Sequence, residues 1–163
     1  MDKKIIYLLV IILALLTSIF LIKKLPKKDD LKIYLPGLQI KDLEGNLINM
    51  SAFTGKPLII NYWASWCGPC REEFLYFEKN YKLYGHKINF LMVSAEFPET
   101  IKAFKNANNY TLPLAQSQKQ LNELGITSIP VTIIYSAQGN LLSTKTSPLN
   151  EAELNKIICD LIK

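Results

Sequence analysis

Residues 61–70 have the sequence "NYWASWCGPC", which sets Cys67 and Cys70 two residues apart, directly behind an apolar run. That run, residues 57–64 ("PLIINYWA"), has the length of a buried β-strand. After the cysteines, aromatic residues recur at helical spacing as far as Tyr84, and Gly85 is a typical helix stop. We therefore expect the cysteine pair at the turn between a strand and the N-terminus of a helix.

Three kinds of chemistry use a C-x-x-C pair, and two of them are not favoured here. A closed metal site usually takes four ligands, but the chain offers only His86 and Cys159 besides the pair. A permanent bridge across so small a loop removes little entropy from the unfolded chain. The length of 163 residues also allows a hydrophobic core without covalent staples. The spacing therefore favours thiol–disulfide exchange.

Exchange gives each residue of the motif a physical role. The N-terminus of a helix lowers the pKa of a cysteine thiol, so Cys67 is the expected nucleophile. It would form a mixed disulfide with a partner, which Cys70 then resolves. Pro69 suits the first helical turn, Gly68 leaves room for a partner's backbone, and Trp66 is expected to cover the disulfide and help partners dock.

Strands and helices alternate through the rest of the chain, which favours an α/β fold with a mixed central sheet and helices on both faces. An N-terminal β-hairpin is predicted at residues 38–50, around Gly45 and Asn46. Asn150 and Glu153 form the capping box of a last helix. The remaining predicted elements are strand 87–95, helix 98–109, strand 110–116, short helix 118–125, and the paired strands 131–136 and 141–146.

The N-terminus predicts a membrane anchor. Residues 5–22 form an 18-residue run without charge, long enough to cross a bilayer as a helix. The run ends in "FLIKKLPKK" and lacks the small-residue site of a cleavable signal peptide. We expect a transmembrane anchor with basic flanks over residues 1–28, a tether over residues 29–34 and a folded domain over residues 35–163.

Charge supports this division. Residues 1–28 hold six lysines and one aspartate, whereas the rest of the chain has 13 basic and 13 acidic side chains. The folded part therefore shows no basic surface of the kind that binds nucleic acid. The positive-inside rule would put the domain in the cytoplasm, since more lysines follow the run than precede it. Exchange chemistry favours the periplasmic or extracytoplasmic side instead, which is the location we expect.

With this motif and order of elements, residues 35–163 resemble the thioredoxin superfamily. A second match is "GITSIPVT", residues 125–132, which is similar to the loop in which that family keeps a cis-proline facing the cysteines. The resemblance implies a cis Ile129–Pro130 bond and a substrate segment docked along Ile129 and Pro130. It implies no cofactor beyond a redox-active Cys67–Cys70 disulfide.

Within that superfamily the chain resembles the membrane-anchored, extracytoplasmic reductases of cytochrome c maturation. The anchor, the strand–helix insertion at residues 99–116 and Asn61 carry this resemblance. Cytosolic thioredoxins place a proton-handling aspartate at the position of Asn61. The resemblance therefore suggests Glu73, one turn after Cys70, as the residue that tunes the thiol pKa and moves its proton. A solvated glutamate is the alternative interpretation of Glu73.

The sequence thus predicts a protein-disulfide reductase that takes electrons from a membrane thiol reductase and reduces exported clients such as apocytochrome c. An anchored thiol oxidant or isomerase is the first alternative. Two further alternatives are less favoured. A peroxiredoxin-type peroxidase requires other residues at the positions of Ile60 and Ala64. Copper carriers of this fold resemble a C-x-x-x-C motif with a distal histidine, and this chain has neither. Glu96 and Phe97 are expected to contribute selectivity, and Trp63 to be core. Cys159 is expected to be a stray thiol, with a mixed-disulfide or dimer contact as the alternative.

Overall fold

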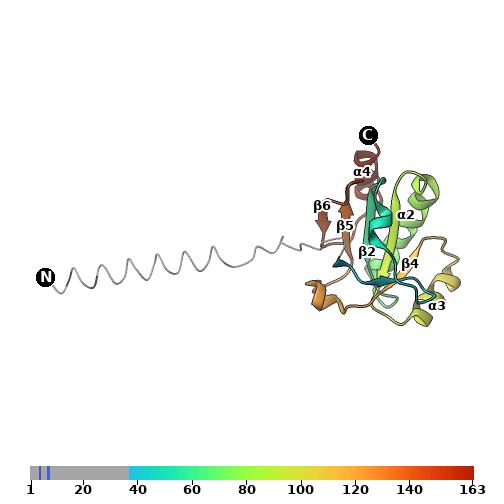
Figure 1. Cartoon of the computed structure of the whole chain (residues 1–163), viewed down its shortest axis with the longest axis horizontal. Helices are drawn as coiled ribbons and strands as arrows, with labels where there is room; N and C mark the ends of the chain where they lie inside the picture. The colour runs from blue at the N-terminus through green and yellow to red at the C-terminus, as the bar shows by residue number, and fades with distance from the viewer. Residues whose placement is uncertain (1–3, 5–6, 8–36) are drawn as a thin grey trace. The chain divides into compact units, whose positions relative to one another are not determined.

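The computed structural model describes Lys4, Tyr7 and residues 37–163 (Figure 1). The predicted anchor at residues 5–22 and the tether at residues 29–34 lie outside the described residues, except for Tyr7, so both stay predictions. Of the helices in the described part, none combines the length and the apolar character needed to cross a membrane.

A six-stranded mixed sheet forms the centre of the domain, in the order β1-β4-β3-β2-β5-β6. Strands β2, β3 and β4 are parallel to one another, and β1, β5 and β6 run antiparallel to their neighbours. The strands are β1 Ile40–Lys41, β2 Leu58–Tyr62, β3 Asn89–Ser94, β4 Leu114–Ser117, β5 Val131–Tyr135 and β6 Leu141–Lys145. The predicted mixed sheet is therefore confirmed.

Three α-helices and two described 3-10 helices cover the sheet. They are η2 Met50–Phe53, α2 Gly68–Tyr84, α3 Pro98–Asn108, η3 Leu121–Leu124 and α4 Glu151–Leu161. Helices α2 and α4 lie side by side (Figure 1), joined by a hydrogen bond from Asn80 to Asn155 and an ion pair between Lys79 and Glu151. The capping box of Asn150 and Glu153 is confirmed at the start of α4.

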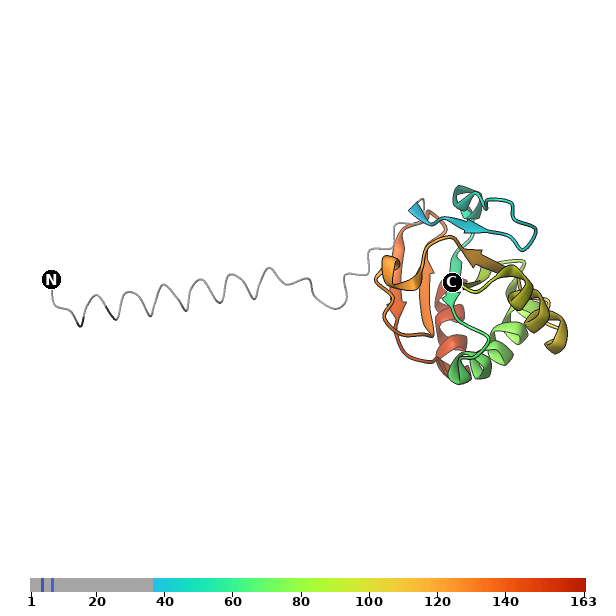
Figure 2. The same cartoon turned by 90° about the horizontal axis from the view of Figure 1, so that it is seen from below.

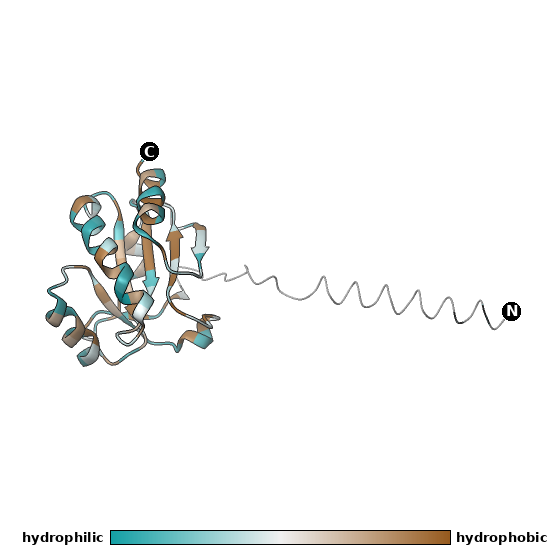
Figure 3. Cartoon of the chain, turned by 180° about the vertical axis from the view of Figure 1, so that it is seen from behind, coloured by the Kyte–Doolittle hydropathy of each residue, from teal (hydrophilic) through white to brown (hydrophobic). Residues whose placement is uncertain are grey.

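Successive side chains of the central strands point to opposite faces of the sheet, so the core is divided into two clusters, one on each face. On β2, Ile59 belongs to the cluster under the three α-helices, whereas Ile60 belongs to the other. The second cluster is closed by η2, η3 and the segment that begins at Leu38, which lie across the sheet from α2 and α4 (Figure 2). Figure 3 shows the central strands mostly in the brown of apolar residues, as expected for strands buried on both faces.

The predicted N-terminal hairpin is only partly correct. Its turn forms, because the Asp42 carboxylate accepts hydrogen bonds from the backbone N–H groups of Glu44 and Asn46. Its second strand is reduced to one bridge between Lys41 and Leu47. The chain leaves the strand there because the Asn49 side chain caps η2, and β1 instead pairs with β4.

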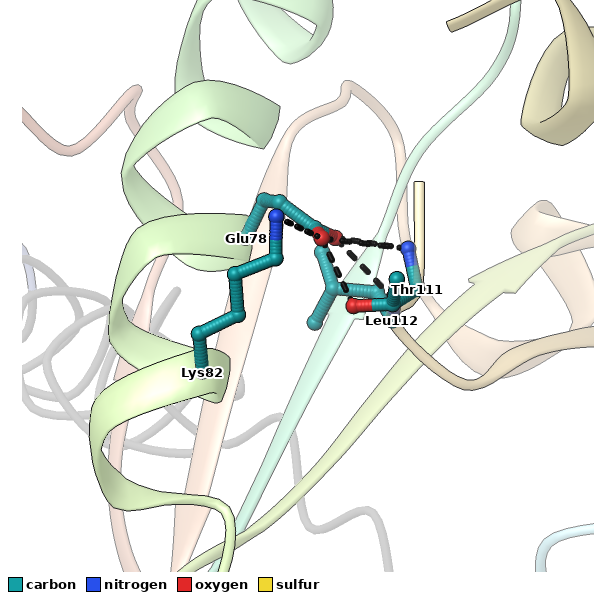
Figure 4. A network of polar contacts seen from close by, with 4 residues as sticks. All are labelled: Glu78, Lys82, Thr111 and Leu112. Atoms are coloured by element: carbon teal, nitrogen blue, oxygen red, sulfur yellow. Dashed lines mark hydrogen bonds and ion pairs between the residues drawn. The ribbon is translucent and has the colours of Figure 1, made fainter. Parts of the chain in front are cut away.

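The predicted strand at residues 110–116 begins later, at Leu114, because a carboxylate holds the preceding segment. Glu78 of α2 accepts hydrogen bonds from the N–H and hydroxyl of Thr111 and from the N–H of Leu112, and it forms an ion pair with Lys82 (Figure 4). Burial alone would raise the pKa of Glu78, but these donors together lower it. The contact ties α2 to the segment that leads into β4.

Candidate active site

The two cysteines lie at the junction of β2 and α2, as predicted. Cys67 is the N-cap residue, and its sulfur accepts a hydrogen bond of 3.2 Å from the N–H of Cys70. The pair is joined as a disulfide, with Cα atoms 5.3 Å apart. Gly68 and Pro69 between them are exposed, whereas both cysteines are buried. The loop of the motif is therefore the part that a partner can approach.

The turn before β5 faces the nucleophile. The Ile129–Pro130 bond is cis, which confirms that prediction, and the Ile129 carbonyl oxygen lies 3.9 Å from the Cys67 sulfur. This turn precedes β5, which pairs with β2, so the sheet itself places Pro130 opposite the cysteines. The backbone of this turn is therefore adjacent to the sulfur, in a position where an extended partner segment can pair with it as an added strand.

A groove of about 710 Å³ runs from this turn to Trp66, just before the cysteine motif. Its lining includes Trp66 and Ile129, together with residues 120–122 at the start of η3 and the end of β3. Trp66 is 75% exposed, so its ring is available to a partner rather than to the core. The structure thus brings the predicted docking residues Trp66 and Ile129 to one surface.

Glu96 lines the same groove but has a second task. Its carboxylate accepts hydrogen bonds from the N–H and hydroxyl of Ser65, at 2.7 Å and 2.6 Å, and from the Ser94 hydroxyl. It therefore fixes the segment before Trp66 to the end of β3. Phe97 is 77% exposed and is not among the described residues that line the groove. Any selectivity from Phe97 would come from outside this groove.

Glu73 is buried, at 2% exposed, which is contrary to the solvated alternative. Its carboxylate accepts hydrogen bonds from the backbone N–H of Leu149 and, at 3.4 Å, from the side-chain amide of Asn61. Burial raises the pKa of Glu73 to about 7, against which the bonds from Leu149 and Asn61 act. A carboxyl group that changes protonation near neutral pH, one helical turn from Cys70, suits proton transfer.

Trp63 and Cys159 were not expected to take part in the exchange. Trp63 is fully buried and packs against Phe74 and Phe104, so it is core. Cys159 is a free, exposed cysteine on α4. Within the described residues, no three of the His, Cys, Asp and Glu side chains gather as a metal site would need.

Two residues around Glu73, Thr132 and Leu149, were not found by sequence reasoning. The amide of Asn61 also donates to the Thr132 hydroxyl, at 3.0 Å, and Leu149 contributes only its backbone. Thr132 lies two residues after Pro130, which is a weak signal that it is near the site. Nothing in the sequence indicates the contact between Leu149 and Glu73, because a backbone N–H donor is present whatever the side chain.

Comparison with known proteins agrees with this geometry. The sequence pattern of the AhpC/TSA family matches residues 34–143. The thiol-disulfide oxidoreductase ResA of Halalkalibacterium halodurans is 30% identical over 129 residues, covering 76% of this chain and 72% of that protein. The thioredoxin-like protein YneN of Bacillus subtilis is 29% identical over 126 residues, covering 74% of each chain.

A solved structure gives the fold. The crystal structure of a thiol:disulfide interchange protein of the thioredoxin family from Chlorobium tepidum superposes with a TM-score of 0.67 at 22% sequence identity. The match covers 76% of this chain and 91% of that one. The predicted thioredoxin-like α/β fold is therefore confirmed for the folded domain.

Proposed function

Because this chain belongs to the AhpC/TSA family and holds the Cys67–Cys70 pair at the start of α2, we propose that it reduces disulfides of exported client proteins, such as apocytochrome c, through this pair. It is a thiol-disulfide oxidoreductase, as the named relatives and the cysteine pair indicate. The observation that carries the proposal is the Cys67–Cys70 disulfide at the N-terminus of α2, beside the Ile129–Pro130 turn. Client class and reductive direction are our proposal.

The reaction proceeds in two exchanges that start from the reduced pair. The Cys67 thiolate attacks a client disulfide, so that a bond between Cys67 and one client sulfur forms while the client bond breaks. The released client thiolate takes a proton from solvent. Cys70 then loses its proton to Glu73 and attacks the Cys67 sulfur, which closes the Cys67–Cys70 disulfide and frees the second client thiolate. The client gains two electrons and the pair loses two.

The docking roles follow from exposure. Trp66, Gly68 and Pro69 form the exposed rim around the buried Cys67, and they would carry the first contact with a client. Ile129 and Pro130 would then hold an extended client segment beside the sulfur, in the manner of an added strand. The site uses no cofactor in this proposal, since the cysteine pair itself carries the electrons.

The proposed cycle needs a source of electrons and a location. We propose that a membrane thiol reductase reduces the Cys67–Cys70 disulfide after each client has been served. The run of residues 5–22 would insert in the bilayer and hold the domain on the periplasmic or extracytoplasmic side. That side is where client disulfides persist, because cytosolic thiols are kept reduced.

Trapping of mixed disulfides tests the client proposal. In a Cys70→Ala variant of the full chain the mixed disulfide on Cys67 is not resolved, so clients should accumulate as covalent adducts that dithiothreitol releases. A Cys67→Ala variant is the matched control and should trap none. If Cys70→Ala traps no protein from an extracytoplasmic fraction, the proposed function is wrong.

The reduction potential of the Cys67–Cys70 pair tests the direction of exchange. We expect the full chain, equilibrated with glutathione or dithiothreitol buffers, to have a reduction potential below about −220 mV, as for thioredoxin-like reductants. A value near about −120 mV would instead indicate a thiol oxidant that installs disulfides. That result would contradict the reductive direction while leaving the exchange chemistry in place.

A further inference from the structure

Within the described part of the chain, the amide nitrogen of Asn61 makes two hydrogen bonds, whereas its amide oxygen makes none. Its nitrogen donates to Glu73 Oε2 at 3.4 Å and to Thr132 Oγ1 at 3.0 Å. Its oxygen, Oδ1, is buried and has no hydrogen-bond partner among the described residues. Asn61 itself is 1% exposed, so solvent does not reach this oxygen directly. A buried acceptor without a donor is unusual and calls for an explanation.

The chemistry of the asparagine carboxamide explains the unpaired oxygen. An asparagine side chain has two N–H donors at one end and a carbonyl acceptor at the other, and half a turn about Cβ–Cγ exchanges them. With its nitrogen toward Glu73, the amide suits a carboxylate, which only accepts. With its oxygen toward Glu73, it suits a protonated carboxyl group, which donates. The Thr132 hydroxyl can accept or donate, and so suits either orientation.

We propose that Asn61, held by Thr132, is a positioning residue that follows the protonation state of Glu73 by rotation of its amide. In this way it lets Glu73 accept the proton of Cys70 and return it. This inference rests on the proposed function and deepens it. It also explains why Oδ1 has no donor among the described residues, since this oxygen would accept a hydrogen bond from the O–H of Glu73 once Glu73 is protonated.

The proton balance of the step is simple. The Cys70 S–H bond breaks as the Glu73 O–H bond forms, and the Cys70 thiolate then displaces the client sulfur from Cys67. Glu73 afterwards gives the proton, directly or through solvent, to the client thiolate that leaves. Asn61 gains and loses no proton. It changes only which end of its amide faces the carboxyl group.

The surroundings of Glu73 suit this role because they are neutral. Cys70 lies one turn before it on α2, Asn61 faces it from β2, and the Leu149 N–H faces it from the segment before α4. Thr132 of β5 reaches it through Asn61. Among the described residues Glu73 makes no ion pair. Hydrogen bonds, rather than a nearby charge, are therefore what the protein can use to adjust this carboxyl group.

The test titrates the Glu73 carboxyl carbon by ¹³C NMR in the full chain labelled at glutamate, with Glu73→Gln to assign the signal. The oxidised form is used, because there Cys67 and Cys70 are joined as a disulfide and do not titrate. Asn61→Leu has nearly the same size but removes the amide partner from both forms of Glu73. The bond to the carboxylate is charge-assisted and is the stronger of the two, so we expect the pKa of Glu73 to rise by about one unit. Asn80→Leu is the control, since it removes a different buried amide, which lies on α2 and contacts Tyr76 and Asn155 rather than Glu73.

A second readout follows the reaction. The pH profile for resolution of a mixed disulfide on Cys67 should move upward in Asn61→Leu by the same amount as the pKa. Thr132→Val should move both quantities in the same direction by less, and Thr132→Ser should restore them, because serine keeps the hydroxyl. A purely structural role of Asn61 would not produce matched shifts or a rescue by serine.

The outcomes separate this inference from the proposed function. If Asn61→Leu leaves the titration and the profile where Asn80→Leu leaves them, the positioning role is wrong while exchange still stands. If the unaltered chain resolves no mixed disulfide, the proposed function is wrong, and the role of Asn61 in the reaction falls with it. Matched shifts in an active protein support both.

Discussion

At the scale of the residue, exposure separates the groups that meet a partner from those that do the chemistry. Trp66 and the loop between the cysteines are exposed, whereas Cys67, Cys70 and Glu73 are buried. A single turn of chain thus presents a contact surface and shields the sulfur atoms behind it. Changes at these positions are therefore expected to act on different steps.

Trp66→Ala should affect protein clients selectively. Because the ring is 75% exposed, its removal should change the free energy of unfolding by less than about 0.5 kcal/mol. The rate of exchange with a protein disulfide should fall several-fold, while reduction of the Cys67–Cys70 disulfide by dithiothreitol stays unchanged. Leu83→Ala, an exposed residue near the other end of α2, is the control. Equal loss with both substrates would argue against a docking role.

At the scale of the element, the stability of α2 depends on contacts at its C-terminal end, at Gly85, and along its length, at Glu78. Gly85 was predicted as the helix stop, and α2 does end at Tyr84 with Gly85 as its C-cap, which confirms that prediction. The φ of Gly85, −59°, is right-handed, so a left-handed conformation is not what favours glycine at this position. A different reason requires glycine there. A Cβ atom on Gly85 would lie 2.7 Å from the carbonyl oxygen of Tyr81, closer than the backbone allows.

Gly85→Ala is therefore expected to destabilise the protein by about 2 kcal/mol, since the last turn of α2 must move to admit the methyl group. Gly68→Ala is the matched control, because a Cβ there meets nothing within 4 Å. That variant should be neutral, or more stable by about 0.5 kcal/mol. Chemical denaturation measures both. Equal stability of the two variants would contradict the steric argument.

The Glu78 contact (Figure 4) gives a second prediction for α2. Glu78→Gln should lower the free energy of unfolding by about 2 kcal/mol, because an amide nitrogen would then face the N–H donors of Thr111 and Leu112. Glu72→Gln, on the exposed side of the same helix, should change it by less than about 0.5 kcal/mol. Hydrogen exchange at Thr111 and Leu112 should speed up only in the first variant; no change there would exclude the contact as an anchor.

At the scale of the whole molecule, the site lies where three separate parts of the chain meet on one face of the sheet. Asn61 and Thr132 are paired residues of β2 and β5, and Glu73 reaches them from α2. The segment before α4 closes the arrangement with the Leu149 N–H. The stability of the molecule is therefore linked to the ionisation of Glu73.

Stability should fall as the pH rises through the range in which Glu73 loses its proton. The pKa of Glu73 is raised from 4.5 to about 7, so the folded state holds the proton more tightly than the unfolded state does. The contribution is fully present below pH 4.5 and is lost as the pH passes 7. Relative to Glu73→Gln, the protein should lose up to about 3 kcal/mol between these limits.

Urea unfolding of the oxidised chain at several pH values between 4.5 and 8 measures this loss. Glu72→Gln should keep the pH dependence of the unaltered protein, since its carboxylate is exposed. Parallel curves for the unaltered protein and Glu73→Gln would show that Glu73 does not carry the effect.

The sequence by itself determined the features that depend on a few neighbouring residues. The strand before Cys67, the helix after it, the capping box at Asn150 and the loop with Pro130 are all found where they were predicted. Each has a local physical cause, such as apolar periodicity or the satisfaction of free N–H groups at a helix end. Resemblance to a known family supplied the cis geometry of Pro130 and suggested Glu73.

Only the tertiary structure decided what surrounds Glu73. Asn61 and Thr132 are 71 residues apart in sequence, and Leu149 is 76 residues from Glu73. Their contact depends on the register between β2 and β5 and on how α4 packs beside α2. These in turn depend on burial of the whole core, so no local pattern encodes them. The protonation of the active site is thus a property of the assembled fold, whereas the reactive cysteines are already evident in the chain.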